Sequence, residues 1–102
     1  MPEHVRPYPL PVVLVVENDV LERVFKAATL RRQGLEVFEA ADIAEAVTVL
    51  KKMAVDILIS DVSLIGGTVL ARLAKEHQPT TQIVWMAALP SRPNSVWTAA
   101  LH

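Results

Sequence analysis

Three polar side chains follow an apolar run near the start of the chain. Glu17, Asn18 and Asp19 come directly after VVLVV, in the stretch VENDVLER. Carboxylate and amide oxygens are suitable ligands for a hard divalent cation such as Mg²⁺. The same stretch could simply begin a helix, because Asp19 and Glu22 form an Asp-x-x-Glu capping pattern. We favour the cap for Asp19 and leave both interpretations open for Glu17 and Asn18.

A further acidic residue, Asp61, ends the apolar run VDILIS and is the strongest functional candidate in the chain. The alternative is an aspartate that starts a loop and accepts hydrogen bonds from nearby backbone amides. Function in an open parallel sheet collects at the carboxyl ends of the strands. If the first and third strands are neighbours, Glu17 and Asp61 should therefore meet at one edge of the sheet.

The elements that must position these residues alternate between strand and helix. Continuous β-branched runs such as VVLVV are typical of strands buried on both faces of a parallel sheet. Helical spacing and Asp-x-x-Glu caps separate the strands. The patterns predict strands at 12–16, 35–40, 55–60 and 82–89, with helices at 19–32, 42–52, 68–77 and about 94–101. This order predicts an α/β fold with right-handed crossovers.

The helical spacing also predicts which side chains face the sheet. In the helix over 19–32, the side chains expected outward are Arg23, Lys26 and Arg32. The side chains expected inward are Val20, Val24, Ala27 or Ala28, and Leu30 or Arg31. In the helix over 68–77, the expected inward side chains are Val69, Leu70, Leu73 and Ala74.

The segments VVLVVEND, DILISDV, ADIAEAVTVLKK and QIVWMAA together resemble the receiver domain of bacterial two-component response regulators, over about residues 12–88. The resemblance implies a three-layer αβα, flavodoxin-like fold of strand order 2-1-3-4-5. The four prolines among residues 1–11 indicate a leader, and the receiver-like domain is expected over residues 12–102.

The resemblance implies a phosphorelay function. Asp61 would accept a phosphoryl group from a histidine kinase or phosphotransfer protein. A carboxylate attacks phosphorus poorly unless charge on the phosphoryl oxygens is neutralised. Receivers use Mg²⁺ for this, and the positions that resemble its ligands are Glu17, Asn18 and Asp61. Such a domain is a signalling module, not an enzyme.

The sequence departs from the family pattern in several places. Asn18 stands where an aspartate is usual, so weaker Mg²⁺ binding is expected. Ala87 stands at the switch position, where receivers carry a hydroxyl that moves on activation. The loop after Asp61 is short, and the fifth strand, with its lysine, and the fifth helix are missing. An alternative is therefore a pseudo-receiver that binds proteins without being phosphorylated.

Two enzyme-like alternatives are weaker. An aspartate-nucleophile phosphohydrolase needs a second carboxylate two residues after the nucleophile, where this chain has Ser63. A flavodoxin-like FMN protein needs a phosphate loop rich in Ser, Thr and Gly after the first strand, and ENDVL offers none.

Composition and charge exclude several other classes of protein. The chain has 102 residues, a formal net charge of −1 and no cysteine. One domain is expected, without disulfides or thiolate metal sites. The chain has no basic block of the kind that binds nucleic acid. No apolar run is long enough to span a membrane, so a cytoplasmic location is expected. Without a fifth strand, the apolar strand over 82–89 would form an edge, which predicts self-association or a domain swap.

Overall fold

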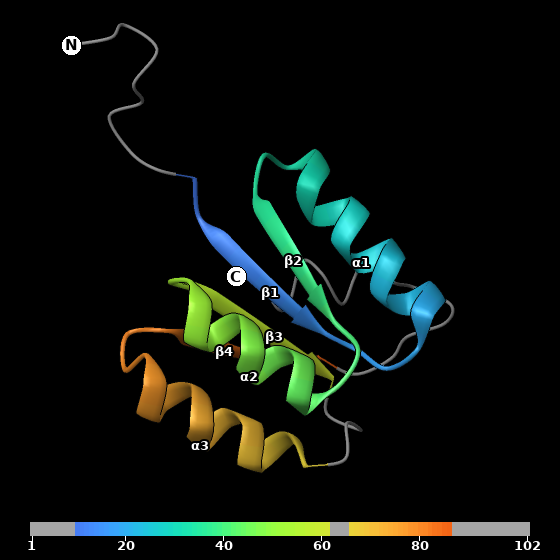
Figure 1. Cartoon of the computed structure of the whole chain (residues 1–102). Helices are drawn as coiled ribbons and strands as arrows, with labels where there is room; N and C mark the ends of the chain where they lie inside the picture. Colours follow the sequence, from blue (N-terminus) through green and yellow to red (C-terminus); the bar gives the residue numbers. More distant parts are fainter. Residues whose placement is uncertain (1–9, 62–65, 87–102) are drawn as a thin grey trace, which may run out of the picture.

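The chain forms a parallel sheet with helices on both faces (Figure 1). The computed structural model describes residues 10–61 and 66–86. Its strands are β1 (Val12–Val16), β2 (Glu36–Ala40), β3 (Ile57–Asp61) and β4 (Gln82–Met86), and its helices are α1 (Val20–Arg32), α2 (Ile43–Lys52) and α3 (Gly67–His77). All neighbouring strands are parallel, in the order β2-β1-β3-β4. The predicted three-layer α/β architecture is confirmed.

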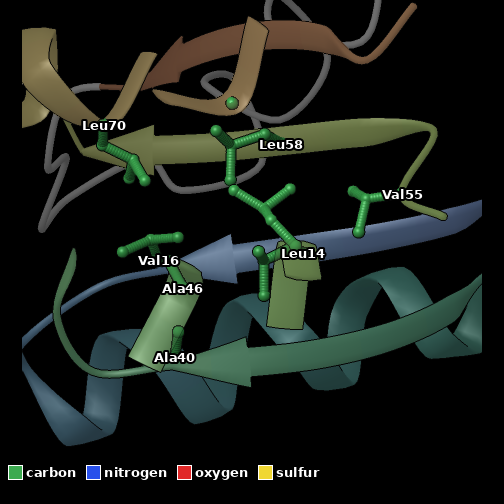
Figure 2. Close-up of a cluster of buried hydrophobic side chains, with 9 residues drawn as sticks. Leu14, Val16, Ala40, Ala46, Val55, Leu58 and Leu70 are labelled. Carbon is green, nitrogen blue, oxygen red and sulfur yellow. The ribbon is translucent and has the colours of Figure 1, made fainter. Parts of the chain in front are cut away.

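Two apolar cores lie on opposite faces of the sheet, because successive side chains of a buried strand point to opposite sides. Leu14 of β1 and Leu58 of β3 pack with α2 and α3 (Figure 2). Val13 and Val15 pack on the other face with α1. Figure 1 accordingly shows α1 on one side of the sheet and α2 with α3 on the other. This double burial explains why β1 reads as an uninterrupted apolar run.

The element boundaries agree with the sequence prediction within two residues where they are described. β3 begins at Ile57 instead of residue 55 and includes Asp61. β4 is described as far as Met86, while the predicted helix near 94–101, the leader up to residue 9 and Ala87 lie outside the described residues. None of the described helices is long and apolar enough to cross a bilayer.

The predicted orientation of α1 is wrong for Val20, Val24 and Lys26. Val20 and Val24 are 56% and 51% exposed, whereas Lys26 is only 4% exposed. Ala27 and Leu30, both among the positions predicted inward, are buried, and Lys26 lies on the same inward face. These positions also have helical spacing, and acidic partners at the sheet edge offset the cost of burying the lysine charge. In α3, Val69 is likewise exposed, while Leu70 and Ala74 face the core as predicted.

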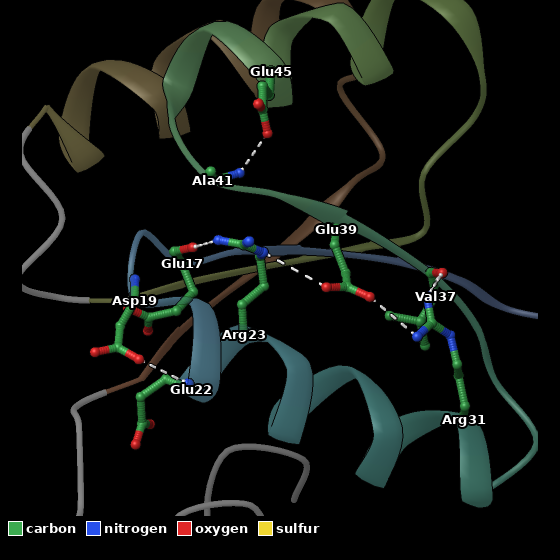
Figure 3. Close-up of polar contacts among 9 residues, drawn as sticks. All are labelled: Glu17, Asp19, Glu22, Arg23, Arg31, Val37, Glu39, Ala41 and Glu45. Atoms are coloured by element: carbon green, nitrogen blue, oxygen red, sulfur yellow. Dashed lines mark hydrogen bonds and ion pairs between the residues drawn. The ribbon is translucent and has the colours of Figure 1, made fainter.

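Aspartates cap two helices, as predicted. Asp19 Oδ1 accepts a hydrogen bond of 2.9 Å from the backbone N–H of Glu22 at the start of α1. Asp42 Oδ1 accepts one of 2.9 Å from Glu45 N–H at the start of α2, and Glu45 Oε1 accepts one of 2.7 Å from Ala41 N–H (Figure 3 shows this last bond). Each cap satisfies a backbone donor that the helix leaves without a partner.

Replacing Asp42 by alanine is expected to lower the free energy of unfolding by about 1 kcal/mol, because the Glu45 amide loses its acceptor. Urea unfolding followed by circular dichroism would measure the change. Glu76→Ala, at an exposed position of α3, is the control and should stay within about 0.5 kcal/mol of the unchanged protein. An Asp42→Ala protein as stable as that control would contradict the capping role.

Candidate functional site

The adjacent strands β1 and β3 bring two carboxylates to one edge of the sheet. Val16 and Ser60 are partners in the parallel register, so Glu17 and Asp61 each come one position later. Both residues are buried, with Glu17 3% and Asp61 4% exposed. The sequence prediction that these two acidic positions converge is supported by this register. Carboxylates this far from water require a positive partner or hydrogen-bond donors.

A lysine from α1 supplies that positive charge. Lys26 Nζ lies 2.7 Å from Glu17 Oε1 and 3.8 Å from Asp61 Oδ2. It also lies 3.9 Å from Glu22 Oε1, on a side chain that is 40% exposed. The ammonium group is thus within 4 Å of three carboxylates from three different elements or loops. Glu17 and Asp61 therefore share one cation, and that cation is the Lys26 side chain of the protein itself.

Both oxygens of the Glu17 carboxylate have partners inside the protein. Oε1 accepts the 2.7 Å hydrogen bond from Lys26, and Oε2 accepts a 3.1 Å hydrogen bond from the backbone N–H of Asp19. The backbone of Glu17 is held too, because its N–H donates to the Ala40 carbonyl over 3.0 Å. Its carbonyl oxygen accepts a 2.8 Å hydrogen bond from Arg23 Nη1 (Figure 3). Glu17 is therefore held at side chain and backbone.

A second ionic cluster fastens α1 to β2 beside this site. Arg23 Nε lies 3.5 Å from Glu39 Oε1, and Arg31 Nη1 lies 3.1 Å from Glu39 Oε2. Arg31 Nη2 also donates to the Val37 carbonyl over 2.8 Å, as Figure 3 shows. Because Arg23 contacts both Glu17 and Glu39, it links the acidic edge of β1 to the neighbouring strand.

The other predicted site residues are not brought into this cluster. Asn18 and Asp19 are exposed, and Asp19 acts as the helix cap described above. Ala87 and Ser63 lie outside the described residues. Over residues 10–61 and 66–86, no group of three His, Cys, Asp or Glu side chains is arranged to hold a metal ion.

Sequence reasoning missed Lys26, the most informative residue of the site. Lysine is normally exposed, so apolar periodicity assigned it to the solvent face. One signal was present: Arg23, Lys26, Ala27 and Leu30 follow the i, i+3, i+4, i+7 spacing of a single helix face. That face follows directly after the acidic end of β1, whose carboxylate can pair with a buried cation.

A hollow of about 430 Å³ lies far from these charges. Its walls include Met53 and Ala54, just before β3, and Thr80, just before β4, together with Gln78. These residues stand at the amino ends of the strands, whereas Asp61 stands at a carboxyl end. The hollow therefore contributes nothing to the chemistry of the acidic site.

A protein-family model and a curated protein both match this chain. The model of the family "Response regulator receiver domain" matches residues 13–99. The aerobic respiration control protein ArcA of Escherichia coli K12 is 34% identical over 69 residues, which are 66% of this chain and 29% of ArcA. This chain thus spans less than a third of that relative.

Solved structures share the fold. The receiver domain of the hybrid histidine kinase CckA has a TM-score of 0.73 and 32% identity, covering 88% of this chain and 93% of that one. The response regulator TrrA of Thermotoga maritima, solved in complex with Mg²⁺-BeF, has a TM-score of 0.71 over 89% of this chain and 81% of its own. At 20% identity, TrrA supports the fold alone.

Proposed function

This chain belongs to the response regulator receiver domain family, and from that premise we propose that Asp61 accepts a phosphoryl group from a histidine kinase or phosphotransfer protein. Receiver domains are signalling modules of two-component systems and not classical enzymes. For this chain, the identity of the acceptor residue and of the phosphoryl donor is our inference.

One observation carries the proposal: the carboxylate of Asp61, at the carboxyl end of β3, has the Lys26 ammonium 3.8 Å from its Oδ2. In the transfer, a carboxylate oxygen of Asp61 attacks phosphorus, and the bond from phosphorus to the leaving group breaks with its electron pair going to that group. Positive charge beside the acceptor stabilises the phosphoryl oxygens during this step. Lys26 is positioned to provide such charge.

Receiver domains generally bind Mg²⁺, and Glu17, Asn18 and Asp61 remain its predicted ligands here. The carboxylate oxygens do not fit a resident divalent cation, because the Lys26 ammonium group contacts Glu17 Oε1 and lies close to Asp61. Asn18 is exposed and carries no charge with which to compensate. We therefore assign no step of the transfer to the metal.

The proposal is tested by phosphorylating the full chain with acetyl phosphate, with MgCl₂ in one arm and EDTA in the other. Intact-mass spectrometry should detect the mass of one phosphoryl group, and peptide mapping should locate it at Asp61. Asp61→Asn should lose the label entirely, because an amide does not act as the nucleophile.

Asp56→Asn is the matched control, since Asp56 is an exposed aspartate just before the same strand; it should keep the label. Absence of label from the unchanged protein in both arms, or label on Asp61→Asn at the original level, would refute Asp61 as the acceptor.

A second candidate function is that of a protein-binding module independent of phosphorylation. Its support is an apolar patch on α1, formed by the exposed side chains of Val20, Leu21, Val24 and Phe25. Exposed apolar patches commonly mark association surfaces. This function predicts an unlabelled protein whose partner affinity is the same in Asp61→Asn. Self-association through residues 82–89, the absence of nucleic-acid binding and the cytoplasmic location also remain predictions.

A further inference from the structure

We infer that Lys26 is the resident cation of the acidic site, and that Mg²⁺ binds there only by competing with it. This inference concerns the site of the proposed function and identifies the cation that lies against Glu17 and Asp61 in the resting protein. It does not depend on Asp61 being phosphorylated, because it concerns the unmodified carboxylates.

The first support is burial. Lys26, Glu17 and Asp61 are each no more than 4% exposed. A lysine side chain usually keeps its ammonium group in water and buries only its methylene groups. In this chain the ammonium group itself is enclosed and donates a 2.7 Å hydrogen bond to Glu17 Oε1. The side chain is therefore held in the site by its charge as well as by its stem.

The second support is the arrangement of the oxygens that would bind a metal ion. A magnesium ion requires a compact shell of oxygen ligands and carries two positive charges. An ion shared by Glu17 and Asp61 would have to displace the ammonium group, because like charges repel strongly at such short separations. Glu17 Oε2 does not offer an easy alternative, since it accepts a hydrogen bond of 3.1 Å from Asp19 N–H.

The third support is the backbone that fixes α1. The Asp19 cap and the contact from Arg23 to the Glu17 carbonyl set the start of α1 against the end of β1. Lys26 follows from the next turn on the same inward face as Ala27 and Leu30. Moving the ammonium group away would break its 2.7 Å contact with the buried Glu17 carboxylate, and removing one partner of a buried ion pair is strongly unfavourable.

The test uses MgCl₂ alone as the probe, with no phosphoryl donor. Binding is measured by isothermal titration calorimetry, and the thermal midpoint by circular dichroism, at constant ionic strength. Four full-length proteins are compared: unchanged, Lys26→Gln, Lys26→Arg and Arg32→Gln. Arg32 is exposed in the last turn of α1, so Arg32→Gln removes the same formal charge without touching the site.

We expect Mg²⁺ to shift the midpoint of the unchanged protein, Lys26→Arg and Arg32→Gln by less than about 2 °C. Lys26→Gln should unfold at a lower temperature than the others and be restored by Mg²⁺. Its apparent affinity for Mg²⁺ should be at least about tenfold tighter than that of the unchanged protein, because the competing charge is gone.

The inference is overturned if the unchanged protein binds Mg²⁺ as tightly as Lys26→Gln. If Lys26→Gln does not fold even with Mg²⁺, the arginine variant decides. Lys26→Arg retains a cation, so clear stabilisation of that variant or of the unchanged protein by Mg²⁺ overturns the inference, and its absence in both supports it.

The outcome is separable from that of the proposed function. Weak Mg²⁺ binding without a phosphoryl label would reject Asp61 as the acceptor and leave Lys26 as the resident cation. Tight Mg²⁺ binding by the unchanged protein together with a label at Asp61 would do the reverse.

Discussion

Replacing Leu14 by alanine is expected to lower the free energy of unfolding by about 3 to 4 kcal/mol, which is a large part of the stability of a small domain. Leu14 is fully buried and pairs with Phe38 of β2 and Leu58 of β3 across the centre of the sheet. In Figure 2 it lies within the cluster between the sheet and α2. Packed strands on both sides limit how far a cavity could collapse.

Urea unfolding monitored by circular dichroism would measure this loss. Leu21→Ala is the matched control, since Leu21 is 78% exposed on α1 and its truncation should change stability by less than about 0.5 kcal/mol. A Leu14→Ala protein that unfolds at nearly the same urea concentration as Leu21→Ala would show that this face of the sheet is not packed as described.

Gln78→Ala is the second large loss, of about 2 to 4 kcal/mol, because one side chain holds three segments together. Gln78 Nε2 donates to the carbonyls of Leu50 and Met53 at 2.8 and 2.7 Å. Its Oε1 accepts from Val55 N–H at 2.7 Å. Truncation leaves these partly buried groups without partners.

The same unfolding measurement applies to Gln78, with Gln33→Ala as its control. Gln33 is exposed at the end of α1, and its truncation should have little effect. Gln78→Glu is informative as well, because a carboxylate keeps the acceptor but loses the donor to Leu50 and Met53. If Gln78→Ala were as stable as Gln33→Ala, this side chain would not be what holds the end of α2 to β3.

The fold was predictable because its signals are strong and local. Gly34, just after α1, adopts a positive φ of 90°, as is typical of a glycine that ends a helix. The apolar run VVLVV and the Asp-x-x-Glu caps each have a direct physical meaning. Together they determined the order of elements and hence the parallel sheet. The convergence of Glu17 and Asp61 followed from a rule about strand ends, without any knowledge of side-chain contacts.

The role of Lys26 could not be predicted in the same way. Rotating α1 by about one residue exchanges Val20 and Val24 for Lys26 on the inward face, and apolar periodicity alone prefers the valines. The decision depends on the charges of Glu17 and Asp61, which come together only once β1 and β3 are paired. A pattern within one helix holds no information about that distant pairing.

The sequence separation of the site's contacts has a consequence for how it assembles. Lys26 and Glu17 are nine residues apart, whereas β1 and β3, which place Asp61, pair across 44 residues, as in the contact of Val12 with Asp56. Closing the longer loop has the greater entropic cost and slows folding. The lysine and glutamate thus form a short-range pair, whereas Asp61 reaches the same ammonium group only when the long-range pairing of β1 with β3 is complete.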